Sequence, residues 1–476
     1  EELAADCYHR YELCLVEHRN DSAAHYLEFR AALDTTNVDW ALDAGNFLYS
    51  FLSHYDDAMF YYERALRNAQ KQYGLESTVV AVMYNNMGNV HNSKGDYSIA
   101  LSYYTNALEI YNSTTSDCSL DKANCLSNIG LIYEMQDLYS EALSYYTNAL
   151  EEYKAAKADS SSCIANCYDN MGVVYSKQGD YAKAIECYYS ALDIYKSING
   201  GDWSGIANCY SHIGSEFLEY EAYSEALSMF SAALEIYTTL YGENHPDVAT
   251  CYDNIGRIYE EQDDYEKALS NYSKSLEIRK SIYGNSHLWV AEIYFKIGRV
   301  YTCQDLNAEA LKNYLAALGI YYAIEDADPG TVASCCYYIG CEYGKLGDNE
   351  TALRSYSAAL KIYKLIGDDT DPNIMKCYCN VGAIYAANKL YDEALENFYL
   401  ALEIAKSIYG EDQIQTAMCY NNIAYVHGAK GNYPESLKYA ELALSVYKEK
   451  SPENHYMIGQ IEDIINAAKS AIAGDR

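Results

Sequence analysis

A row of polar side chains recurs in this sequence at intervals of 42 residues. Six members are asparagines, and the full row runs Asn86, Asn128, Asn170, His212, Asn254, Lys296, Tyr338, Asn380 and Asn422. A carboxamide both donates and accepts hydrogen bonds, so a line of them can pair with the main chain of an extended peptide whatever its sequence. The alternative interpretation is that these amides bond to neighbouring helices or hold water.

Cysteine follows the same period at seven of its sixteen positions. These are Cys125, Cys167, Cys209, Cys251, Cys335, Cys377 and Cys419. Small, polarisable thiols suit a tight contact between helices, and cysteines one repeat apart are too distant for a disulfide, which needs Cα atoms within about 7 Å. Cys163 and Cys167 share a helix face, but no histidine stands beside them at zinc-finger spacing. We interpret the recurring cysteines as packing residues and predict no metal site.

Catalytic motifs do not emerge from the sequence. The ten histidines are scattered, and no phosphate loop, dinucleotide fingerprint, HExxH or GxSxG pattern occurs. The sequence therefore predicts a protein that is not an enzyme, with no catalytic residues and no cofactor.

The elements that carry these residues form a repeat of constant length. Its small residue recurs every 42 positions, at Gly88, Gly130, Gly172, Gly214, Gly256, Gly298, Gly340, Gly382 and Ala424. An aromatic residue follows three positions later in seven copies, and a leucine ends the pattern at Leu108, Leu150, Leu192, Leu234, Leu276, Leu318, Leu360, Leu402 and Leu444. Nine copies without insertion indicate a repeat array.

Each copy is predicted to form two amphipathic helices. Apolar residues recur at three- and four-residue steps over residues 167–175 and again over 184–195, which is the stripe of a half-buried helix. Gly179 and Asp180 predict the turn between them, since Gly tolerates a positive φ and Asp can cap the next helix. Small side chains at Gly172 and Ala184 let the helices approach closely. One hairpin cannot bury its apolar faces alone, but a stack can.

The order of small residue, aromatic, alanine, aromatic and alanine resembles the tetratricopeptide repeat family. It is met at Gly172, Tyr175, Ala184, Tyr188 and Ala191, and the resemblance covers residues 80 to 450. The usual repeat has about 34 residues, so each copy here is longer. The 42-residue length and the linker YGENHPDVA at residues 241–249 are similar to the kinesin light chain repeats. Only this linker has the His-Pro-Asp form, and no heptad region precedes the array, so the resemblance extends to the repeat subclass and not to motor function.

The resemblance also implies a location for the binding surface. In this family the first helix of each unit lines the concave side of a superhelix, and members that hold peptides grip the peptide backbone with an asparagine at this place. The resulting candidate partner-binding residues are Asn86, Asn128, Asn170, His212, Asn254, Lys296, Asn380 and Asn422. If the interruptions divide the row into separate sites, these extend over residues 86–254 and 380–422.

We predict an all-α fold, a right-handed superhelical solenoid of helix-turn-helix hairpins with a C-terminal capping helix. A repeat array of this kind escapes the limit of roughly 250 to 300 residues on one hydrophobic core. The expected divisions are a degenerate hairpin at 1–38, a degenerate repeat at 39–80 with Asn46 in the small position, nine repeats at 81–450, and a capping helix at 451–476 that starts at Pro452.

The charge of the chain limits the classes of partner. Acidic residues outnumber basic ones 68 to 34, for a formal charge of −34. Such a surface repels phosphate backbones, which excludes nucleic acid. It keeps an elongated helical surface soluble and would attract a basic protein or peptide. No apolar run approaches the ~20 residues that a membrane span needs.

The expected function is a protein-interaction adaptor that takes an extended segment of a partner in its groove. An alternative is a structural subunit that self-associates into a scaffold or filament. It is favoured by the excess of tyrosine over phenylalanine, 55 to 8, and by pairs such as Tyr188 and Tyr189 that must place one ring outward. A third is the regulatory part of an enzyme. Because Glu1 is not a start methionine and no signal segment precedes Leu3, we expect a processed chain or a fragment, in the cytoplasm or, after processing, outside the cell.

Overall fold

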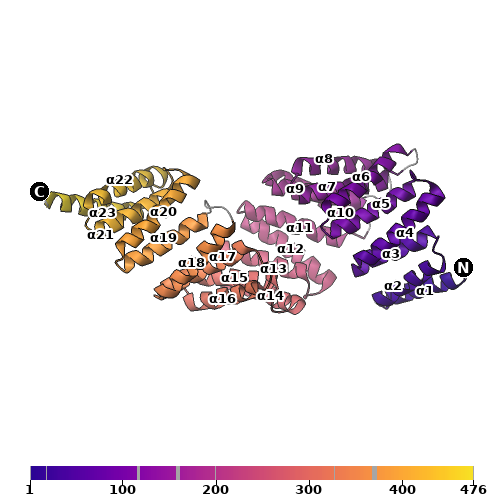
Figure 1. Ribbon diagram of the computed structural model, residues 1–476, viewed down its shortest axis with the longest axis horizontal. Helices are drawn as coiled ribbons and strands as arrows, with labels where there is room; N and C mark the ends of the chain where they lie inside the picture. The colour runs from indigo at the N-terminus through magenta and orange to yellow at the C-terminus, as the bar shows by residue number, and fades with distance from the viewer. Residues whose placement is uncertain are drawn as a thin grey trace. The chain divides into compact units, whose positions relative to one another are not determined.

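The computed structural model describes residues 2–17, 19–114, 118–156, 161–198, 200–325, 327–366 and 372–474. These residues form 23 α-helices and no β-strand, which confirms the predicted all-α class. The chain divides into two compact units, Glu1–Leu240 and Tyr241–Arg476. Figure 1 shows that each unit is built from successive helical hairpins.

In the first unit, consecutive helices pair through short turns, and the second helix of one pair contacts the first helix of the next, as α4 does with α5 and α6 with α7. This chain of contacts buries apolar faces that a single hairpin would leave in water. The helices are α1 (Glu2–Val16), α2 (Asn20–Leu33), α3 (Val38–Leu52), α4 (Tyr55–Tyr73), α5 (Thr78–Ser93), α6 (Tyr97–Ser113), α7 (Ser119–Met135), α8 (Tyr139–Ala155), α9 (Ser161–Lys177), α10 (Tyr181–Ser197), α11 (Trp203–Glu219) and α12 (Tyr223–Tyr241).

The second unit is built by the same rule and ends in an extra helix. Its helices are α13 (Pro246–Glu261), α14 (Tyr265–Tyr283), α15 (Leu288–Cys303), α16 (Asn307–Tyr322), α17 (Pro329–Lys345), α18 (Asn349–Ile366), α19 (Pro372–Ala387), α20 (Tyr391–Tyr409), α21 (Ile414–Ala429), α22 (Tyr433–Lys450) and α23 (His455–Gly474). The last helix packs on α22 and α21 and buries Ile461 and Ile465. It begins three residues after the predicted Pro452, because Asn454 Oδ1 caps it by accepting from the Met457 amide at 3.2 Å.

From α3 onward, the turn inside each hairpin places one residue in the left-handed backbone region, seven positions after the small residue in the regular repeats. Gly179 has φ +77° as predicted, and Asp180 accepts a 3.3 Å hydrogen bond from the Lys183 amide at the start of the next helix. Other repeats use Asp, Glu or Lys at the equivalent position, such as Asp137 at φ +58°. The turn therefore tolerates the modest cost of a side chain there.

Glycine at the small position allows the two helices of a hairpin to meet through an aromatic ring. A Cβ on Gly172 would lie 2.5 Å from Cε1 of Tyr188, and one on Gly88 would lie 2.5 Å from Cε1 of Tyr104. Both tyrosines are at most 2% exposed. The sequence-based prediction of a close approach at Gly172 is confirmed. The structure shows that the ring of Tyr188 fills the space.

In the degenerate repeat, the predicted small residue is wrong by one position. A Cβ on Gly45 would lie 2.8 Å from Cε1 of Tyr62, so Gly45 and not Asn46 occupies the small position. Asn46 Oδ1 instead accepts a 2.9 Å hydrogen bond from the Tyr62 hydroxyl. This hairpin has one more residue between its small position and Ala58 than the other hairpins have between their small position and the equivalent alanine. Counting back 42 residues from Gly88 therefore reaches Asn46, one position after the true small residue.

The recurring cysteines pack inside the units, as predicted. All seven are at most 1% exposed, and all sixteen are free thiols. Burial raises the pKa of the Cys125 thiol to about 12, so it stays protonated and unreactive at neutral pH. Within the described residues, every helix is too short or too polar to cross a lipid bilayer.

Candidate protein-binding surface

The eight candidate residues all lie on first helices of hairpins and are all half-buried. Their helices are α5, α7, α9, α11, α13, α15, α19 and α21. First helices of successive hairpins contact one another, for example α5 with α7 and α19 with α21. Within each unit, a candidate can thus be close to the preceding repeat, and its partners there decide what it can still bind.

Two of the asparagines are held by the preceding repeat through uncharged hydrogen bonds. Asn128 Nδ2 donates to Asn89 Oδ1 at 3.0 Å and to Asn85 Oδ1 at 3.3 Å. Asn380 Nδ2 donates to the Tyr337 hydroxyl at 3.4 Å. The partners Asn85 and Tyr337 each lie 43 residues earlier in the chain, three positions before the small residue of their own repeat.

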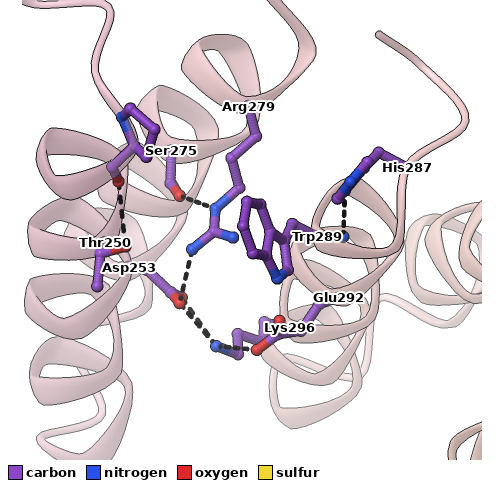
Figure 2. Close-up of polar contacts among 9 residues, drawn as sticks. Thr250, Asp253, Ser275, Arg279, His287, Trp289, Glu292 and Lys296 are labelled. Atoms are coloured by element: carbon purple, nitrogen blue, oxygen red, sulfur yellow. Dashed lines mark hydrogen bonds and ion pairs between the residues drawn. The ribbon is translucent and has the colours of Figure 1, made fainter. Parts of the chain in front are cut away.

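The two ionisable members of the row make charged versions of the same contact. His212 Nδ1 lies 3.0 Å from Asp169 Oδ1, and Lys296 Nζ lies 2.8 and 3.0 Å from the two oxygens of Asp253, as Figure 2 shows. Burial alone would lower the pKa of His212, but the hydrogen bond and charge of Asp169 outweigh it and raise the pKa. These contacts tie consecutive first helices together.

The remaining members differ in what they bond. Asn86 Nδ2 donates to Asn46 Oδ1 at 3.3 Å. Within the described residues, Asn170, Asn254 and Asn422 have no side-chain hydrogen bond. The residue 43 positions before Asn170 is Ser127, whose side chain is shorter than that of Asn, Asp or Tyr. The row therefore divides into members bonded to another helix and members with free amides.

Sequence reasoning missed a second set of polar contacts, which ties the two helices of a hairpin together. The buried Tyr146 hydroxyl donates to Glu134 at 3.0 Å, and the buried Tyr272 hydroxyl donates to Glu260 at 2.7 Å. The acceptor lies four residues after the small position and the tyrosine sixteen after. A paired exchange in the sequence could have revealed this contact. The repeat with Phe230 in place of the tyrosine also has Leu218 in place of the acceptor.

One buried carboxyl in the first unit is only partly satisfied. Glu216 in α11 is 3% exposed, and its Oε2 atom has no hydrogen-bond partner among the described residues. Burial raises the pKa of this carboxyl, although a hydrogen bond from Ser176 and the charge of His212 oppose the shift. Because the folded state then holds the proton more tightly than the unfolded chain, the free energy of unfolding falls as the pH rises through the folded pKa.

We expect Glu216→Gln to stabilise the first unit at neutral pH by about 1 kcal/mol, since the amide removes a buried charge with an unpaired oxygen. The gain should vanish in acid, where Glu216 itself is protonated. Urea unfolding at neutral and acidic pH measures both effects. Glu225→Gln, at an exposed carboxylate of α12, is the control. Destabilisation by Glu216→Gln at neutral pH would show that the charge is better satisfied than its contacts indicate.

The next question is whether these side chains could hold a metal ion. Among the described residues, no group of three or more His, Cys, Asp or Glu side chains is arranged to hold a metal ion. One pair of thiols, Cys379 and Cys419, has sulfur atoms 4.0 Å apart. The surface carries amide and charged groups that can donate or accept hydrogen bonds.

Comparison with known proteins identifies the repeat. A sequence model described as tetratricopeptide repeat matches residues 79–155, 161–238, 221–281, 254–323 and 374–449. A second model with the same description matches residues 333–364. Neither describes a catalytic domain, and a search of curated protein sequences returns no match.

Two solved structures with TM-scores above 0.5 show the same fold at low sequence identity. The apo form of the quorum sensor NprR from B. thuringiensis is 18% identical, with a TM-score of 0.57 over 77% of this chain and 98% of that chain. A signal transduction ATPase with numerous domains and a tetratricopeptide repeat sensor, from Pyrococcus horikoshii, is 15% identical, with a TM-score of 0.59 over 84% of this chain and 57% of that chain. BtubC (BKLC) from P. vanneervenii is 21% identical, with a TM-score of 0.45 over 48% of this chain and 92% of that chain.

Proposed function

Because the chain belongs to the tetratricopeptide repeat family, we propose that it is an adaptor that binds a partner protein as an extended segment along the first helices of its hairpins. The observation that carries the proposal is the set of half-buried amides at Asn170, Asn254 and Asn422, which make no hydrogen bond within the described residues. An amide of this kind can donate to a main-chain carbonyl and accept from a main-chain N–H. The segment would therefore be gripped largely independently of its sequence.

The bonded members of the row support the same surface in a different way. Asn128, His212, Lys296 and Asn380 hold each first helix to the preceding one. Before a partner arrives, contacts of this type fix the spacing between the two first helices that each of them joins. A binding surface set in advance loses less conformational entropy on association than a mobile one.

The direct test removes two free amides together, in the double variant Asn170→Ala, Asn254→Ala. Short peptides selected by the chain from a displayed random library serve as the probe, and fluorescence anisotropy gives their affinity. Each lost hydrogen bond is worth about 1 kcal/mol, so we expect the affinity to fall roughly tenfold or more while helical content stays unchanged.

The matched control replaces two asparagines on second helices, in the double variant Asn106→Ala, Asn148→Ala. Both side chains are exposed and lie on α6 and α8. Their loss should leave the affinity unchanged. Equal affinities for the chain and the Asn170→Ala, Asn254→Ala variant would remove the row as the binding surface.

Self-assembly is a second candidate function, favoured by large exposed apolar side chains on the first two hairpins. Phe29, Phe51 and Phe60 are 45%, 58% and 56% exposed, and aromatic residues in the open are enriched at protein interfaces. Molar mass measured by light scattering over a range of concentrations separates the two functions. A constant monomer mass supports the adaptor, whereas growth into polymers supports the structural subunit.

A further inference from the structure

Helix α14 carries an arginine where most other repeats have a buried tyrosine. Arg279 lies 23 residues after the small residue Gly256, and the equivalent positions hold Tyr111, Tyr153, Tyr195, Tyr237, Tyr321, Ala405, Tyr363 and Tyr447. A second exchange accompanies it, because Ser275 replaces the alanine found at this place in the other eight repeats. Arg279 Nε donates to Ser275 Oγ at 3.2 Å. The two exchanges together adapt this one repeat to a buried guanidinium.

Most of the hydrogen-bonding capacity of Arg279 remains unused. The residue is 7% exposed, yet its Nη2 atom is 3.7 Å from the nearest oxygen of Asp253, which is too far for a hydrogen bond. Asp253 is engaged more closely by Lys296, at 2.8 Å. Apart from the bond to Ser275, the guanidinium makes no hydrogen bond within the described residues. Figure 2 shows it between Asp253 and the ring of Trp289.

Arg279 lines a cavity. Its volume is about 280 Å³, and its lining consists of Pro246, Asp247, Thr250, Arg279, Tyr283, Trp289 and Glu292. The Trp289 ring forms one wall, with its centroid 5.7 Å from the Arg279 guanidinium carbon. The guanidinium has an acidic neighbour, Asp253 at 3.7 Å, and a planar anion can accept two parallel hydrogen bonds from its Nη groups. The cavity is therefore complementary to a small anionic group.

The surrounding charges restrict which anion fits. Asp247 and Glu292 line the same cavity, so a multiply charged phosphate would be repelled there. Lys296 contributes little net positive charge, because Glu292 at 2.9 Å and Asp253 both neutralise it. Because this repulsion grows with the charge of the ligand, a singly charged group is favoured over phosphate. A carboxylate is such a group, and it matches the planar fork of a guanidinium through two parallel hydrogen bonds.

We propose that this cavity binds the carboxylate of an aspartate or glutamate side chain in the partner segment. That the carboxylate comes from a partner rests on the proposed adaptor function, whereas the carboxylate specificity rests on the cavity alone. The site would add sequence preference to a surface that otherwise grips main chain. It would also select an acidic residue at one position of a partner, although the chain as a whole is strongly acidic.

The cavity is tested by titrating the whole chain with acetate and following the indole N–H signal of Trp289 by NMR. Acetamide, which is neutral and of the same shape, is the control ligand, with ionic strength held constant by sodium chloride. The signals of Trp40 and Trp203 serve as internal references. We expect a saturable shift of the Trp289 signal with acetate, and none with acetamide.

The decisive variant restores the residues of the other repeats, Arg279→Tyr with Ser275→Ala. Since Tyr and Ala occupy these positions together in most of the array, this variant is expected to fold. Its helical content by circular dichroism, together with a dispersed Trp289 signal, reports whether the second unit does so. The acetate shift should disappear in it. In the single variant Arg279→Lys, which keeps the charge but loses the planar fork, the acetate affinity should fall several-fold. No saturable shift in the unaltered chain, or the same shift in the restored variant, would overturn the site.

The source of the carboxylate is tested with the peptides selected for the adaptor surface. Replacing a peptide glutamate by glutamine should weaken binding to the unaltered chain roughly tenfold, as for loss of a charge-assisted pair, and should not affect binding to the restored variant. If acetate binds but this peptide exchange has no effect on either protein, the partner source is refuted and a free small carboxylate is the ligand. The acetate titration does not involve Asn170 or Asn254, so the two proposals fail independently.

Discussion

We expect Gly172→Ala to lower the free energy of unfolding of the first unit by about 2 to 3 kcal/mol, because an added methyl group would overpack a filled helix contact. The new Cβ would lie 2.5 Å from Cε1 of Tyr188. That ring is 2% exposed and has the His212 ring on another side, with centroids 4.9 Å apart. It has little room to retreat, so the two helices must separate.

Two further alanine variants serve as comparisons. The free energy of unfolding of all three is measured by urea unfolding followed by circular dichroism. Gly214→Ala places its Cβ 3.1 Å from Phe230, so its cost should be smaller. Gly319→Ala in α16 meets no atom within 4 Å and should stabilise its helix by up to about 1 kcal/mol through helix propensity. If Gly172→Ala behaves like Gly319→Ala, the close approach of the helices is wrong. The chain itself offers a parallel, because the repeat with Ala424 at the small position has Ala440 in place of the ring.

Glu260→Leu should destabilise the second unit by about 2 to 4 kcal/mol, since it breaks a buried pair and leaves its partners unsatisfied. Glu260 is 7% exposed. It accepts from the Tyr272 hydroxyl at 2.7 Å and from Arg299 Nη2 at 2.7 Å. Tyr272 is fully buried, so its hydroxyl cannot find water when the carboxylate is gone.

The second substitution Tyr272→Phe should restore much of the lost stability. The double variant reproduces the pair Leu218 and Phe230, which occupies the same two positions in the first unit. A double-mutant cycle from guanidinium unfolding gives the coupling between the two side chains. Additive effects of the two substitutions would mean that the hydroxyl and the carboxylate do not depend on each other. Arg299, which is 41% exposed in its side chain, can turn to solvent and should account for little of the loss.

The helical framework was predictable because its determinants are local and repeated nine times. The spacing of Gly172, Ala184 and Tyr188 is enough to place two helices and their contact, and the turn at Gly179 follows from its backbone freedom. The prediction was wrong where the repeat changes length by one residue, at Gly45 and Asn46. The 42-residue interval alone cannot reveal an inserted residue. The position of the Tyr62 ring, which faces Gly45, reveals it.

The candidate surface was predictable as a row but not as a set of contacts. Whether Asn128 or Asn170 is bonded or free depends on residues of the preceding first helix. Asn128 meets Asn85, whereas the equivalent residue for Asn170 is Ser127. That comparison needs the register between two helices, and the sequence pattern does not supply it.

The sequence by itself determined that this chain is an all-α array of 42-residue hairpins with small residues at the helix contacts, because amphipathic period and residue size act over a few neighbouring positions. Only the tertiary structure decided which polar groups remain available to a ligand. Asn170 has a free amide while Asn128 does not, and Arg279 faces a cavity beside Trp289. The reason is physical: hydrogen bonds and ion pairs depend on distances of a few ångströms between residues from different helices, and those distances exist only once the hairpins have stacked.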